Sequence, residues 1–178
     1  KRWIFEEAFR MPFIARLPGR IQAGSTTDLL GANIDFAPTL LEAVGLPIPN
    51  AMQGKSFLKI LETGKAPAGW RESVYYRYWM HMAHHDNPAH YGIRTQDFKL
   101  IFFYGLPLDA PGSVKQPTEA YWELYDLRND PHEMQNVIAD PQYQSTVKQL
   151  KLQLDQLKTE VGDTDENYPE LKARRDAS

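Results

Sequence analysis

The chain has 178 residues, of which 42% are hydrophobic and 24% are charged, a balance that is ordinary for a globular protein with one or two cores. Its net charge of -3 argues against nucleic-acid and membrane-surface binding, because both favour basic patches. The sequence contains no cysteine, so disulfides, thiolate metal sites and a cysteine nucleophile are excluded within this chain. No apolar run reaches the roughly 20 residues of a membrane span.

The first third of the chain predicts one strand and one helix. Residues 11–17 (MPFIARL) form an apolar run that ends at a Pro-Gly pair, which is typical of a strand buried on both faces. Further on, Asp35 is a candidate N-cap for a helix in IDFAPTLLEAVG, whose apolar face is Leu40, Leu41 and Val44. Gly45 marks the end of this helix.

The stretch GKAPAG at residues 64–69 is the best internal boundary, because it is rich in Pro and Gly and shows no hydrophobic periodicity. After it, the pattern changes to aromatic and β-branched runs that predict an antiparallel sheet with a hairpin turn at Gln96 and Asp97. The predicted strands are residues 74–80, 91–95, 98–104 and 121–127. Residues 106–117, with three prolines, predict a mobile loop.

A long helix is predicted near the end of the chain. Asp140 is placed to cap it, Pro141 stands at the first helical position, and Gly162 follows the last turn. Its apolar stripe is Tyr143, Val147, Leu150, Leu154, Leu157 and Val161. We expect this stripe to pack on the sheet, although a coiled-coil partner helix is an alternative. The residues after Gly162 are polar, and we expect them to be loose.

The stretch HMAHHDNPAH holds four histidines within ten residues: His81, His84, His85 and His90. A zinc site is conceivable because neutral imidazole is a good ligand. However, the spacing matches no known ligand frame, and Pro88 interrupts any helix that could align the rings. The sequence leaves two other interpretations open, a surface loop with incidental histidines and the polar edge of a binding pocket.

The acidic stretch DLRNDPHE, residues 126–133, superficially resembles a calcium loop. It lacks the glycine and the terminal glutamate of an EF-hand. Asp and Asn form Asx turns, so we expect a turn between strand and helix. The chain also lacks a G-x-S-x-G elbow, a P-loop and an H-E-x-x-H motif. The residues alone therefore predict an α+β protein without indicating a reaction.

Six stretches of the sequence resemble, in order, the C-terminal part of type I sulfatases, which are members of the alkaline phosphatase superfamily. They cover most of the chain, up to about Leu157. The stretches are KRWIFEEAFRMPFIARLPG, NIDFAPTLLEAVGLPIP, MQGKSFL, WRESVYY, HYGIRTQDFKLI and WELYDLRNDPHEMQNV. The resemblance implies an α+β fold in which the strand and helix that end an α/β core precede a small antiparallel sheet packed with a C-terminal helix.

The resemblance also implies roles for three residues. Lys1 matches the family's lysine at the start of a K-x-x-x-x-E-x-x-x-R-x-P stretch, followed here by Glu6, Arg10 and Pro12. That lysine contacts the substrate sulfate, a role that suits an ammonium with three donors and a positive charge. His85 and His90 match an H-x-x-x-x-H-Y-G-x-R-T stretch of polysaccharide sulfatases, which implies that they bind substrate.

The departures from the family are equally informative. Its nucleophile is a formylglycine made within a C/S-x-P-S/A-R motif, which does not occur here. Its calcium ligands would precede residue 1, so we expect calcium and formylglycine in a full-length parent and no cofactor site within this chain. We therefore expect a C-terminal fragment, inactive by itself, that associates with the N-terminal part of the same protein. The expected ranges are 1–65 for the end of the catalytic domain, 66–162 for the subdomain and 163–178 for a polar tail.

The resemblance implies that the parent hydrolyses sulfate esters, most simply those of a carbohydrate, in a periplasmic or secreted location. Two alternatives remain open. A phosphonate or phosphodiester hydrolase of the same superfamily uses a similar core, and the nucleophile motif would distinguish it. The chain could also be a scaffold subdomain without chemistry of its own. Neither nucleic acid nor a membrane is expected as a partner.

Overall fold

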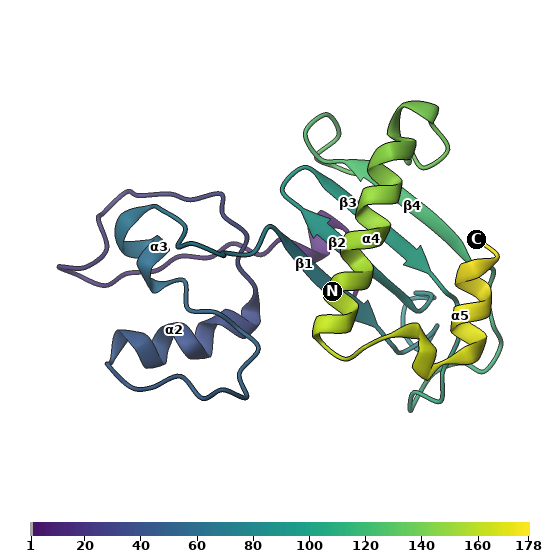
Figure 1. The fold of residues 1–178 in the computed structure, drawn as a ribbon, viewed down its shortest axis with the longest axis horizontal. Helices are drawn as coiled ribbons and strands as arrows, with labels where there is room; N and C mark the ends of the chain where they lie inside the picture. Colours follow the sequence, from purple (N-terminus) through teal and green to yellow (C-terminus); the bar gives the residue numbers. More distant parts are fainter. Residues whose placement is uncertain (1) are drawn as a thin grey trace. The chain divides into compact units, whose positions relative to one another are not determined.

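The computed structural model describes residues 2–178 of the chain (Figure 1). These residues form two compact units, which we describe separately. Unit 1 joins the N-terminal segment up to Met11 to Tyr75–Ser178, and unit 2 is Pro12–Val74. The domain division after residue 65 that the sequence predicts stays a prediction.

The centre of unit 1 is a four-stranded antiparallel sheet. Its strands follow one another in space as they do along the chain. They are β1 (Ser73–Tyr78), β2 (His90–Thr95), β3 (Phe98–Phe103) and β4 (Tyr121–Asp126). Only Gln96 and Asp97 separate β2 from β3, and Arg94 pairs with Lys99 beside this turn. The four strands and the hairpin that the sequence predicts are therefore confirmed.

One face of the sheet is covered by a long helix. Figure 1 shows α4 (Gln144–Glu160) lying across this face. The helix residues buried in this core are Val147, Leu150 and Leu154. Alternate residues of the central strand, Leu100 and Phe102, face them from the sheet, as the period of two in a strand requires. The predicted packing of the helix on the sheet is confirmed.

The helix begins and ends as its terminal residues predict. Oδ1 of Asp140 accepts a hydrogen bond of 2.8 Å from the backbone N–H of Gln142, and a 3₁₀ turn, η2 (Pro141–Tyr143), leads into α4. Gly162 follows with a φ of 72°, in the left-handed region that favours glycine. Val161 departs from the predicted stripe, because 40% of its surface is exposed.

The other face of the sheet is covered by the N-terminal segment, which includes the short helix α1 (Glu6–Phe9). Ile4 is completely buried against Ile101 and Phe103, the strand residues that alternate with those of the first core. Gly92 makes room for this contact, because a Cβ at that position would lie 3.0 Å from Cδ1 of Ile4. This antiparallel sheet is thus buried on both faces, whereas many such sheets leave one face to water.

A buried ion network holds the N-terminal segment to the sheet. The ammonium of Lys99, which has no exposed surface, lies 2.8 Å from Glu6, 2.6 Å from Glu133 and 2.7 Å from the carbonyl oxygen of Ile4. Arg94 also pairs with Glu6 at 3.1 Å. Although burial alone would raise the pKa of Glu6, its hydrogen bonds and ion pairs with Arg94 and Lys99 lower it.

The polar C-terminal segment is ordered, so the prediction of a loose tail is wrong. It forms a 3₁₀ turn, η3 (Asp165–Asn167), and a helix, α5 (Pro169–Asp176). Leu171 is completely buried in the same core as α4, and Tyr168 packs against that core. The guanidinium of Arg174 donates to the carbonyl oxygens of Tyr104 and Thr118. Two apolar anchors and specific charge pairing hold a segment whose composition alone predicts disorder.

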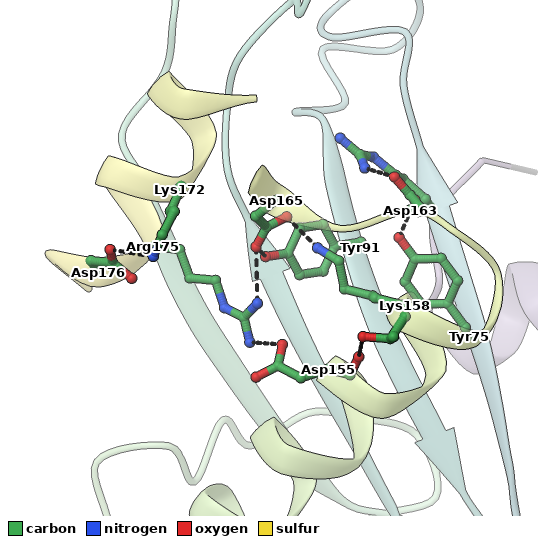
Figure 2. Close-up of polar contacts among 11 residues, drawn as sticks. Tyr75, Tyr91, Asp155, Lys158, Asp163, Asp165, Lys172, Arg175 and Asp176 are labelled. Atoms are coloured by element: carbon green, nitrogen blue, oxygen red, sulfur yellow. Dashed lines mark hydrogen bonds and ion pairs between the residues drawn. The ribbon is translucent and has the colours of Figure 1, made fainter. Parts of the chain in front are cut away.

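The charges of this segment meet around Asp165, which is almost completely buried (Figure 2). Its carboxylate accepts a hydrogen bond of 2.8 Å from the hydroxyl of Tyr91 and pairs with Lys158 and Arg175. Arg175 also reaches Asp155 of α4 at 2.5 Å. Burial would raise the pKa of Asp165, but its hydrogen bond and ion pair with Lys158 and its bonds to Arg175 and Tyr91 lower it.

Unit 2 is built from short helices linked by extended segments. They are η1 (Asn33–Asp35), α2 (Phe36–Ala43) and α3 (Leu58–Thr63). Gly45, with a φ of 76°, follows the end of α2 as predicted, and its N–H donates to the carbonyl oxygen of Glu42. The predicted helix after Asp35 is therefore present.

The role predicted for Asp35 is wrong, because its side chain does not cap α2. The carboxylate is completely buried and accepts backbone N–H groups from Ala32 at 2.7 Å and Lys55 at 2.8 Å. It also forms a two-point ion pair with the guanidinium of Arg71. Asp35 therefore ties three separate parts of unit 2 together.

The strand predicted at residues 11–17 is also wrong. This segment has no regular structure, and its side chains Met11, Phe13 and Ile14 are exposed, with 92% of the surface of Ile14 accessible. A strand buried on both faces needs partner strands for its backbone hydrogen bonds. Residues 12–72, all of which the structure describes, contain no strand.

Candidate functional site

A hollow of about 230 Å³ in unit 1 is the candidate site. Its lining comes from two places in the sequence, the N-terminal segment and the loop between β1 and β2. The lining residues are Arg2, Trp3, His84, His85 and Asn87. Lys1, the predicted sulfate-contacting residue, lies outside the described residues. His85, the first predicted substrate-binding histidine, is exposed at this hollow.

The loop that carries His84, His85 and Asn87 has an unusual backbone. Met82, His85 and Asp86 have φ values of 54°, 56° and 49°, in the left-handed region that non-glycine residues rarely adopt. Such conformations persist only where the surrounding contacts enforce them, and they cluster at binding and catalytic sites. One such contact is the hydrogen bond of 2.9 Å from the N–H of Met82 to the carbonyl oxygen of Asn87.

His81 closes the base of this loop. Its ring is completely buried, and its Nδ1 accepts a hydrogen bond of 3.1 Å from the N–H of Ala89. The proton therefore lies on Nε2, which donates to the carbonyl oxygen of Gln116 at 3.0 Å. Burial lowers the pKa of His81, which favours this neutral form. His81 is thus a structural residue that holds both ends of the loop.

His90, the second predicted substrate-binding histidine, begins β2 and has no exposed surface. Its Nδ1 donates to the carbonyl oxygen of Pro88 at 2.8 Å, and its ring is stacked with Trp3 at 5.8 Å between centroids. Burial lowers its pKa to about 4, so the imidazole is neutral near pH 7. His90 therefore supports a lining residue, Trp3, from beneath. Binding of substrate by His85 and His90 stays a prediction.

Sequence reasoning missed three of the lining residues, Arg2, Trp3 and Asn87. The signal for Arg2 and Trp3 was their position directly after Lys1 in the first matching stretch. Asn87 lies in the histidine stretch, where a polar residue predicts only a position on the surface. In the fold it is completely buried.

The lining groups favour a polar ligand with a negative charge. Arg2 supplies a guanidinium, which matches planar or tetrahedral anions through charge-assisted hydrogen bonds. Trp3 offers an aromatic surface, and Asn87 an amide that can both donate and accept. The hydroxyl of Tyr76 donates to the carbonyl oxygen of Arg2 at 2.8 Å and so fixes the backbone there.

In the two sequence stretches with possible metal ligands, several of the candidate side chains form hydrogen bonds within the fold. Of the four histidines, His81 and His90 bond to backbone carbonyl groups inside the fold. Asp126 of the acidic stretch accepts the N–H of Arg128 and the side-chain amide of Asn129, which forms the predicted Asx turn. Within residues 2–178, no group of three or more His, Asp or Glu side chains could hold a metal ion. The donor groups of this part of the chain therefore do not fit a calcium site.

Comparison with known proteins assigns the chain to a family. The family model described as N-sulphoglucosamine sulphohydrolase, C-terminal, matches residues 1–160. The chain belongs to this family. The resemblance to the C-terminal part of type I sulfatases is therefore confirmed.

Two curated relatives match most of the chain. An N-acetylglucosamine-6-O-sulfatase from Bacteroides thetaiotaomicron is 42% identical over 171 residues, which are 96% of this chain and 28% of that protein. A multifunctional alkaline phosphatase superfamily protein from Trinickia caryophylli is 30% identical over 154 residues, which are 80% of this chain and 27% of that protein. The chain thus spans less than a third of the length of these relatives.

A solved structure also matches this chain. That structure contains a protein in complex with its substrate, D-glucosamine-2-N,6-O-disulfate. The matched region is 92% of this chain and 31% of the chain in that structure. The sequences are 41% identical and the TM-score is 0.80. The predicted α+β class with a small antiparallel sheet is confirmed by this match. Among the described residues, no helix is long and apolar enough to cross a membrane.

Proposed function

We propose that this chain supplies the C-terminal subdomain of a sulfatase that removes 6-O-sulfate from glucosamine units of a sulfated carbohydrate. The observation that carries the proposal is 42% identity, over 96% of the chain, to an N-acetylglucosamine-6-O-sulfatase. The structural match to a complex with a disulfated glucosamine supports the same substrate class. The parent acts in a periplasmic or secreted location, where such carbohydrates are available.

Within this proposal, five residues in or next to the candidate site have a role. Lys1 contacts the substrate sulfate and offsets the negative charge that builds on the transferring group. Arg2 adds a second positive charge near the anion, and Trp3 packs against the sugar ring. His85 hydrogen bonds the sugar from the loop, while His90 keeps Trp3 in position.

The remaining chemistry belongs to the N-terminal part of the parent. There, a formylglycine nucleophile and a calcium ion would supply the attacking oxygen and stabilise the transferring sulfate. This chain has no cysteine and no C/S-x-P-S/A-R motif, and its described residues do not fit a metal site. We therefore infer that the chain alone does not turn over sulfate esters.

The test uses the full-length parent with and without the substitution Lys1→Ala. Removing one preorganised donor that contacts a transition-state charge should lower the turnover of N-acetylglucosamine-6-sulfate by on the order of 10²–10³. Lys1→Arg should restore only part of this loss, because a planar guanidinium does not replace a compact ammonium. Equal turnover by the parent and by Lys1→Ala at matched folding would remove Lys1 from the site.

A second function is favoured by one specific observation. A solved structure of a phosphonate monoester hydrolase from Agrobacterium radiobacter is 26% identical to this chain and matches 71% of it with a TM-score of 0.52. The parent could therefore be a phosphonate or phosphodiester hydrolase with the same subdomain. Assays of the parent on N-acetylglucosamine-6-sulfate and on an aryl phosphonate monoester separate the two. A higher kcat/KM for the phosphonate would favour the second function.

A further inference from the structure

Asn87 has a side chain for which the fold provides no partner. It is completely buried, yet neither Oδ1 nor Nδ2 has a hydrogen-bond partner among the described residues. Its backbone is satisfied, since its N–H donates to His84 and its carbonyl oxygen accepts from Met82. Buried polar groups are almost always hydrogen-bonded, because an unpaired one loses its bonds to water without compensation. This amide therefore requires an explanation beyond folding.

The location of Asn87 indicates that the unused amide serves to bind a ligand. Asn87 is one of the residues that line the hollow, together with Arg2 and Trp3. Nη1 of Arg2 is also buried without a partner, and so is Nε2 of His90, whose ring lies under the indole of Trp3. Three residues around Trp3 thus leave hydrogen-bonding atoms unused, among them both donors and acceptors. Unused groups of this kind in one place are typical of a binding site that is formed before its ligand arrives.

The kinds of atom define the ligand. An amide donates and accepts, so it matches a neutral sugar substituent such as a hydroxyl or acetamido group. The guanidinium of Arg2 matches an anionic group, and the indole of Trp3 matches the apolar surface of a ring. The hollow of about 230 Å³ is smaller than the roughly 300–1,000 Å³ of pockets for drug-sized molecules. One sugar unit with one anionic group fits these properties best.

We propose that Asn87 is a specificity-determining residue that hydrogen bonds a hydroxyl or acetamido substituent of the sulfated sugar, while Arg2 binds its anionic group. The inference rests on the proposed function and deepens it, because it assigns the sugar and the anion to separate side chains. Neither residue was predicted from the sequence. The proposal makes Asn87 destabilising in the free protein and stabilising in the complex.

Direct binding to this chain tests the proposal without depending on catalysis by the parent. The probe is N-acetylglucosamine-6-sulfate, titrated into the 178-residue chain and followed by calorimetry or NMR. The variant Asn87→Leu replaces the amide by an apolar group of similar shape. It should weaken binding of the sugar sulfate by about tenfold or more, because the buried hydrogen bonds to the sugar are lost. Inorganic sulfate, which lacks the sugar, should bind the variant and the original chain equally.

Thermal unfolding of the free chain supplies the second measurement. Asn87→Leu removes an unpaired buried amide, so the melting temperature should rise by about 2–6 °C. A purely structural amide would give the opposite result, since Leu would then break its hydrogen bonds. Arg2→Gln should weaken both the sugar sulfate and inorganic sulfate. Asn167→Leu, at an exposed asparagine of η3, is the matched control and should leave binding unchanged.

Three outcomes would overturn the inference. They are a lower melting temperature for Asn87→Leu, unchanged affinity of this variant for the sugar sulfate, and no binding of the sugar sulfate by the original chain. Each is distinct from failure of the proposed function, which is measured as hydrolysis by the parent. A parent that hydrolyses the sugar sulfate while Asn87→Leu binds it normally would keep the function and remove Asn87 from recognition.

Discussion

Replacing Lys99 by methionine tests the ion network that joins the N-terminal segment to the sheet. The ammonium is completely buried and contacts Glu6 at 2.8 Å, Glu133 at 2.6 Å and the carbonyl oxygen of Ile4 at 2.7 Å. Methionine keeps much of the side-chain volume but removes the charge and all three donated hydrogen bonds. It leaves two carboxylates in a site that excludes most water.

Removing one partner of a buried ion pair typically costs about 3–5 kcal/mol, because the remaining charge is left uncompensated. Glu6 keeps Arg94 as a partner at 3.1 Å, whereas Glu133 loses its only ion pair among the described residues. Glu133 therefore accounts for most of the cost. We expect Lys99→Met to lower the free energy of unfolding by about 3–5 kcal/mol, a large part of the roughly 5–15 kcal/mol of a typical domain.

The assay is urea unfolding followed by tryptophan fluorescence, with the slope of the transition used to check that unfolding stays two-state. Lys148→Met, at an exposed position of α4, is the matched control and should change stability by less than about 0.5 kcal/mol. Adding Glu133→Gln to Lys99→Met should recover about 1–3 kcal/mol, because the second carboxylate charge is then removed. If Lys99→Met costs no more than the control, the ammonium is not paired inside the fold.

Two further predictions concern the same unit. Leu154→Ala should lower the free energy of unfolding by about 2–5 kcal/mol, since this side chain is completely buried between α4 and the sheet. Leu152→Ala, on the same helix with 67% of its surface exposed, should leave the free energy of unfolding almost unchanged. Similar costs for the two variants would place the stripe outside the core. His90 has a folded-state pKa of about 4 against a usual value of 6.5, so the unfolded chain binds its proton first as the pH falls. Stability should therefore decrease from about pH 6.5 downwards, by roughly 2–3 kcal/mol at pH 4.5. His90→Phe should reduce this decrease, measured by urea unfolding at pH values of about 6.5 and 4.5. An identical pH profile for the variant would contradict a buried neutral His90.

The sheet and its helix could be predicted because their signals are local. Each strand is a run of aromatic and β-branched residues, and α4 carries its capping residue Asp140 and its terminal Gly162 within the same stretch. The error at residues 11–17 has the same origin. An apolar run predicts burial, but only neighbouring strands make it a strand, and those lie beyond what a local pattern contains.

The polar interactions could not be predicted because they join distant residues. Lys99 stands in a run of strand residues, and nothing near it in the sequence indicates that Glu6 comes to lie 2.8 Å away. In the same way, Asp165 and Arg175 look like exposed charges of a tail until Tyr91 and Lys158 meet them. The candidate site could likewise be predicted only in part, because its residues come from distant parts of the sequence. His85 was found through a resemblance, while Asn87 was recognised only through its burial.

The way in which unit 1 is assembled limits how this protein can be dissected. Its N-terminal segment and its sheet are separated in the chain by the whole of unit 2, Pro12–Val74, so unit 2 is an insertion within unit 1. Closing a loop of this length costs about 4 kcal/mol of chain entropy, which the contacts of Ile4 and Glu6 must offset. A chain cut after residue 65, where the composition changes most clearly, would uncover Ile101 and Phe103 and leave Lys99 without Glu6. Shorter versions of unit 1 should therefore retain residues 2–11, joined to Tyr75 by a linker or supplied as a separate peptide.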